Sequence, residues 1–75
     1  MLEFLISVDG FDHREEEDFI SLQIDLHKRV CEGTLHFDGR RLFYYISKET
    51  VKLFTKKAIL RLFNSLEGIH AMEIK

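Results

Sequence analysis

One short segment, residues 34–46, constrains the fold of this chain more than any other part of the sequence. The dipeptide Asp38-Gly39 separates two strand-like runs, and Asp-Gly favours the tight two-residue turn of a β-hairpin. We therefore predict a hairpin whose register places Phe37 opposite Arg40. One face of this hairpin is apolar and should be buried: Leu35, Phe37, Leu42, Tyr44 and Ile46. The other face carries Thr34, His36, Arg41, Phe43 and Tyr45.

The segment that follows, from Ser47 to Glu67, is predicted to be one long helix. Ser47 can accept a backbone N–H bond as the N-cap, and Gly68 suits the left-handed residue that ends many helices. At about 100° per residue, six apolar side chains fall on one broad stripe, which we expect to face the core. They are Val51, Phe54, Ala58, Ile59, Leu62 and Leu66.

Leu53 and Leu60 fall on nearly the opposite side of this helix, with Lys57 beside them. Isolated apolar residues are common on protein surfaces, and that interpretation stays open. A second apolar stripe also fits a contact with a partner protein or with another copy of the chain. We therefore take Leu53, Lys57 and Leu60 as candidate partner-binding residues.

Residues 11–33 carry two competing patterns. Apolar and polar residues alternate over residues 18–26, as in a strand, yet a helical stripe is present as well: Phe19, Leu22, Leu26 and Val30. Asp12 and Glu15 have capping-box spacing, and acidic residues gather near the start and basic residues near the end, as the helix dipole favours. We therefore favour a helix that Gly33 ends. The strand alternative would give a mostly antiparallel sheet crossed by one helix.

Residues 2–8 and 69–75 complete the prediction as strands. The element order is then strand, helix, strand, strand, helix, strand, which is the βαββαβ order of the ferredoxin-like fold. We expect one α+β domain over residues 1–75. Its antiparallel four-stranded sheet should have the order last, first, third, second, with two helices on one face and the other face open.

Composition limits the classes of function. A chain of 75 residues is long enough for one domain and too short for two. Its formal net charge of −2 at pH 7 argues against a general nucleic-acid binder. No apolar run reaches the roughly 20 residues that a membrane helix needs, and the first residues lack the pattern of a secretory signal. With a single cysteine, Cys31, we expect a cytoplasmic protein that does not enter a membrane.

Residues 41–46 partly resemble the RNP1 motif of RNA-recognition domains. Four positions match that motif in residue type: Arg41, Phe43, Tyr45 and Ile46. Three positions depart from it: Leu42, Tyr44 and Lys48. The resemblance implies that aromatic rings on the open face stack on bases while the arginine holds phosphate. Because of the departures, we rank nucleic acid below protein as the partner.

The sequence contains no set of residues that predicts catalysis or metal binding. His27 and Cys31 lie four residues apart, but two ligands do not make a zinc site, and no third group is evident to orient the pair. The four glycines are isolated, so they form no glycine-rich phosphate loop. We expect no enzyme activity, no cofactor and no bound metal.

The sequence therefore predicts a small non-enzymatic domain for protein–protein interaction, regulatory or inhibitor-like, that forms a homodimer or binds a protein partner. The candidate partner-binding residues are Arg41, Phe43, Tyr45, Leu53, Lys57 and Leu60. The alternative is a module that binds single-stranded RNA on the open sheet face through Arg41, Phe43 and Tyr45.

Overall fold

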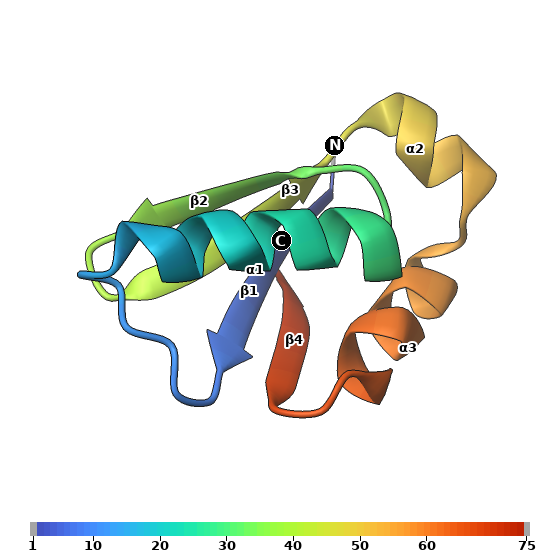
Figure 1. Ribbon diagram of the computed structural model, residues 1–75. Coiled ribbons are helices and arrows are strands. Elements are labelled where there is room, and N and C mark those ends of the chain that lie inside the picture. Colours follow the sequence, from blue (N-terminus) through green and yellow to red (C-terminus); the bar gives the residue numbers. More distant parts are fainter. Residues whose placement is uncertain (1, 75) are drawn as a thin grey trace.

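The computed structural model describes residues 2–74 and has an α+β fold with four strands and three helices (Figure 1). In chain order the elements are β1 (Leu2–Val8), α1 (Glu16–Arg29), β2 (Thr34–Asp38), β3 (Arg41–Ile46), α2 (Lys48–Leu53), α3 (Lys56–Ser65) and β4 (Ile69–Ile74). The helix favoured for residues 18–26 is therefore confirmed over the strand alternative. Lys75, the last residue of the predicted final strand, lies outside the described residues.

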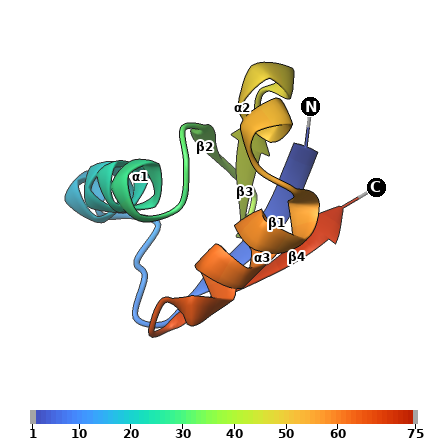
Figure 2. The ribbon, with the colours of Figure 1, turned by 90° about the vertical axis from the view of Figure 1, so that its right-hand side faces the viewer.

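The four strands form one antiparallel sheet in the order β2-β3-β1-β4. Read from the other edge, this is the expected order of last, first, third and second strand. α1 and α3 pack against the same face (Figure 2), where Leu26 and Ile59 join Phe4 of β1 in one buried cluster. Over residues 2–74, the opposite face of the sheet has no helix across it.

The prediction of a single long helix from Ser47 to Glu67 is wrong, because the structure divides this segment into α2 and α3. Phe54 has an extended backbone (φ −134°, ψ 142°), and the Thr55 hydroxyl accepts the Ala58 N–H at 3.1 Å as the N-cap of α3. Threonine favours such local bonds outside helices, and the spacing of apolar residues does not reveal this preference. The arrangement therefore has one helix more than the expected two.

The break also changes which side chains reach the core. Phe54, expected on the core stripe, is 39% exposed, and Leu53 at the end of α2 is 78% exposed. Ile59 is fully buried, as predicted. The predicted N-cap at Ser47 is confirmed, because its hydroxyl accepts the Thr50 N–H at 3.3 Å.

The predicted hairpin is present, but its register differs from the prediction by two residues. Phe37 pairs with Leu42 rather than with Arg40, so the two turn residues are Gly39 and Arg40. Gly39 has a positive φ of 66° and Arg40 does not, which fits a type II′ turn with glycine in its first position. A shift of two residues leaves every side chain on its predicted face. The expected apolar face is accordingly the one turned to the core.

The capping box predicted for Asp12 and Glu15 is wrong. Glu15 is the N-cap residue of α1 without any side-chain capping bond. The Asp12 carboxylate instead accepts bonds from the backbone N–H and the guanidinium of Arg14, at 3.0 and 3.1 Å. These bonds hold the carboxylate near the turn that precedes α1, and they lower the pKa of Asp12.

Tyr44 lies at the centre of the core and is fully buried. Its ring meets that of Phe63 edge-on, with 5.6 Å between centroids, and its hydroxyl donates to the carbonyl oxygen of Cys31 at 2.6 Å. A Cβ atom on Gly33 would lie 2.6 Å from this ring. Gly33 therefore does not end α1, which stops at Arg29, but allows the chain to pass close over Tyr44.

Candidate functional site

The open face of the sheet carries a row of side chains that runs across all four strands. The registers place His36 opposite Phe43, Phe43 opposite Leu5, and Leu5 opposite Met72. Phe43 and Leu5 are half-buried by their neighbours, whereas Met72 is 59% exposed. We call this set, His36, Phe43, Leu5 and Met72, the central row.

A second row lies beside the central row. Thr34 is opposite Tyr45, Tyr45 is opposite Glu3, and Glu3 is opposite Ile74. The rings of Tyr45 and His36 are 6.1 Å apart in an edge-on arrangement. Together the two rows give the open face a largely apolar middle, with the Glu3 carboxylate toward one end of the strands.

Two effects set the electrostatics around Tyr45. Partial desolvation, followed by the neighbouring Glu3 carboxylate, raises the pKa of the Tyr45 phenol, so this group stays neutral at physiological pH. Arg41 begins β3 and is exposed at the end of the strand away from Tyr45. The open face therefore has an acidic end and a basic end with an apolar row between them.

The structure brings three predicted site residues together: Arg41, Phe43 and Tyr45 alternate along β3 and share the open face. The prediction missed Leu5 and Met72, which continue the same surface onto β1 and β4. In the sequence Leu5 is a single apolar residue between Glu3 and Ser7 on its side of the strand, which does not indicate a site. For Met72, only the pairing of β4 with β1 decides which side it faces.

The other three predicted site residues do not form one stripe. Leu53 ends α2, whereas Lys57 and Leu60 lie on α3 beyond the helix break. Leu60 is partly buried against the core, and with Lys57 it borders a shallow depression that also includes Arg61. Because α3 packs on the covered face of the sheet, Lys57 and Leu60 do not adjoin Phe43 and Tyr45.

Comparison with known proteins identifies no relative. No protein-family model, curated protein or solved structure matches the chain. Arguments about its function therefore depend on the geometry and chemistry of its own residues.

Cys31 and His27, the remaining sequence candidates, lie in different environments. Burial raises the pKa of the Cys31 thiol, which disfavours the thiolate, and His27 is exposed on the last turn of α1. Within residues 2–74, no three His, Cys, Asp or Glu side chains are grouped so that they could hold a metal ion. In the same part of the chain, every helix is too short or too polar to cross a bilayer.

Proposed function

We propose that this chain is a non-enzymatic protein-interaction domain of regulatory, inhibitor-like type, which forms a homodimer through the open face of a ferredoxin-like sheet. The observation that carries the proposal is the central row. Phe43, Leu5 and Met72 form a continuous apolar strip across the sheet without a covering element among the described residues. A contiguous exposed apolar patch of this kind is typical of an interaction site.

The arrangement of charge on this face supports a second copy of the chain as the occupant. A two-fold axis that runs across the strands lays the two central rows against each other and reverses the strand direction. The acidic end of one copy, at Glu3, then covers the basic end of the other, at Arg41. One pattern of charge is thus complementary to itself, which favours a defined orientation of the two sheets.

Packing of two open sheets would also bury the aromatic rings of β3. Two antiparallel sheets that pack face to face lie about 10 Å apart, with interdigitated side chains. Phe43 and Tyr45 are long enough to fill such a layer, and aromatic residues are enriched at the cores of interfaces. The buried free thiol of Cys31 agrees with the cytoplasmic location that we include in this proposal.

The test is the molar mass in solution, measured by light scattering over a concentration series at low and high salt. We expect a dimer that Met72→Glu converts to a monomer, because a buried carboxylate in the middle of the interface is costly. Ile24→Glu is the matched control: Ile24 is also a half-exposed apolar residue, but it lies on the outer side of α1. The control should leave the mass unchanged.

A wild-type chain that is monomeric at every concentration would exclude the homodimer. A dimer that Met72→Glu leaves intact would place the contact on another surface, and Leu53→Glu would then be the next variant to measure. If the monomer binds single-stranded RNA, and Tyr45→Ala abolishes that binding, the RNA-binding alternative replaces the present proposal.

A further inference from the structure

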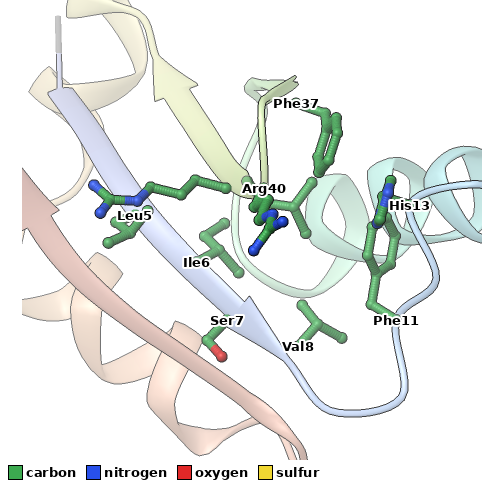
Figure 3. Close-up of a pocket in the computed structure, with 10 residues that line it drawn as sticks. Leu5, Ile6, Ser7, Val8, Phe11, His13, Phe37 and Arg40 are labelled. Carbon is green, nitrogen blue, oxygen red and sulfur yellow. The ribbon is translucent and has the colours of Figure 1, made fainter.

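A cavity of about 320 Å³ lies at the end of the sheet where β1 finishes and the hairpin turns. Its floor and walls are mostly apolar, from Ile6 and Val8 on β1, Phe37 on β2 and Phe11 in the loop of residues 9–15. The polar groups at its rim are the side chains of Ser7, His13, Arg40 and Arg41. Figure 3 shows Arg40 among these residues, with the rings of Phe37 and His13 on the side away from β1.

The cavity lies where the pairing between β1 and β3 ends. β1 and β3 are paired as far as Ile6 and Leu42, but β1 continues to Val8 while it pairs only with β4. β3 begins at Arg41, so the last residues of β1 extend beside the hairpin turn without pairing to it, and the cavity lies between the end of β1 and the turn at Arg40. No neighbouring strand among the described residues therefore fills the space between the apolar side chains that line this cavity.

The loop of residues 9–15 closes one side of the cavity in a fixed position. The imidazole of His13 stacks on the ring of Phe37, with 5.0 Å between centroids and 10° between planes. The Asp12 backbone N–H donates to the Asp18 carboxylate at 3.3 Å, and the Phe11 N–H donates to the Val8 carbonyl oxygen at 3.3 Å. These contacts hold the wall in place before any ligand enters.

The charge at the rim is positive. Among residues 2–74, neither Arg40 nor Arg41 forms an ion pair within 4.0 Å. Asp38 is opposite Arg41 in the strand register without making such a pair, and the Asp12 carboxylate is bound to Arg14. Two arginine side chains without an ion pair among the described residues therefore line the cavity.

We propose that this cavity binds a small organic anion that has an apolar tail and a carboxylate or phosphate head. The apolar walls would take the tail, and the rigid donor fork of each guanidinium suits the paired oxygen atoms of either head group. The volume lies at the lower end of the range for small-molecule sites, which fits a ligand with a short chain or a single ring. The cavity shares Leu5 and Arg41 with the open face. Arg40, the residue that the variant below changes, lies in the hairpin turn outside the central row.

The experiment is a titration followed by backbone amide signals in NMR spectra, with octanoate, octyl phosphate and 1-octanol as probes. We expect at least one of the two anions to shift the signals of Val8, Phe11, His13 and Phe37, and octanol to bind about tenfold more weakly or not at all. Octanoate alone would indicate a carboxylate ligand, octyl phosphate alone a phosphate ligand, and binding of both a site for either head group.

Arg40→Glu is the decisive variant, and Arg29→Glu is its matched control. Arg40 is exposed in the turn, so its replacement should leave the fold intact, and Arg29 is an exposed arginine at the far end of α1. We expect Arg40→Glu to weaken anion binding at least tenfold and Arg29→Glu to change it less than twofold. The proposal is overturned if neither anion binds, if octanol binds equally well, if the shifts lie elsewhere, or if the two variants behave alike.

Discussion

At the residue scale, the hydroxyl of Tyr44 is a polar group inside an apolar core, with the carbonyl oxygen of Cys31 as its acceptor at 2.6 Å. Removal of one partner from a buried hydrogen bond leaves the other without water or protein to bind. We therefore expect Tyr44→Phe to lower the free energy of unfolding by about 1–2 kcal/mol, measured by urea denaturation. Tyr45→Phe removes the same hydroxyl from a more accessible neighbour and should change stability by less than about 0.5 kcal/mol. Equal losses in the two variants would contradict this account.

Tyr44 also makes the stability of the folded state depend on pH in the alkaline range. Burial raises the pKa of Tyr44 above its ordinary value of 10, so the folded state holds this proton more tightly than the unfolded chain. The stabilisation is complete below about pH 10 and is lost as the pH rises further toward the folded-state pKa. Burial of Cys31 acts in the same direction from about pH 9. Between pH 8 and about pH 11, the free energy of unfolding, measured by denaturation curves at both pH values, should fall less in Tyr44→Phe than in the wild type.

At the scale of elements, the break between α2 and α3 distinguishes the structure from its prediction. Thr55→Ala removes the hydroxyl that caps α3, and we expect a loss of about 1 kcal/mol in the free energy of unfolding. In one continuous helix the same change would be neutral or stabilising, since alanine is the better helix former. Ser65→Ala at the other end of α3 is the control, because its hydroxyl bonds only to the Leu62 carbonyl oxygen. A Thr55→Ala variant as stable as the wild type would contradict the break.

Element types followed from the sequence more directly than element boundaries did. The Asp38-Gly39 pair identified the hairpin, but it could not decide whether glycine takes the first or the second turn position. That choice depends on the backbone conformation, and it moved the register by two residues. Likewise the spacing of apolar residues after Ser47 indicated helix throughout, while the local bond at Thr55 divided it. Both errors arose from short-range backbone geometry that periodicity does not report.

At the scale of the whole molecule, a chain of 75 residues can gain only a few kcal/mol of net stability from one small core. If the open faces of two copies pair, association stabilises the folded state by mass action. The melting temperature of the wild type should then rise over a hundredfold increase in protein concentration, measured by circular dichroism. Met72→Glu should melt at one temperature across that range, and an equal dependence in both proteins would argue against the homodimer.

The candidate surface shows how far a sequence leads toward a site. The alternation along one strand was enough to place Arg41, Phe43 and Tyr45 on the open face. Met72 required the pairing between β1 and β4, which the pattern of the last strand did not determine. The cavity beside Arg40 could not be inferred at all, because it depends on where the pairing of β1 with β3 ends and on the loop residues Phe11 and His13 that line it. Such a feature belongs to the assembled molecule.

The position of β1 has a consequence for how the chain is made. Of the four strands in the sheet, β1 is synthesised before the others, yet it lies in the middle of the sheet, where Glu3 pairs with Tyr45 on one side and with Ile74 on the other. Both of its hydrogen-bonding edges stay open on the ribosome until distant segments emerge, and the edge toward β4 stays open longest. Long-range pairings of this kind are slow to form, and an unpaired edge can be joined by another chain. A strand that lies inside the finished sheet is therefore the one that waits longest for a partner in the nascent chain.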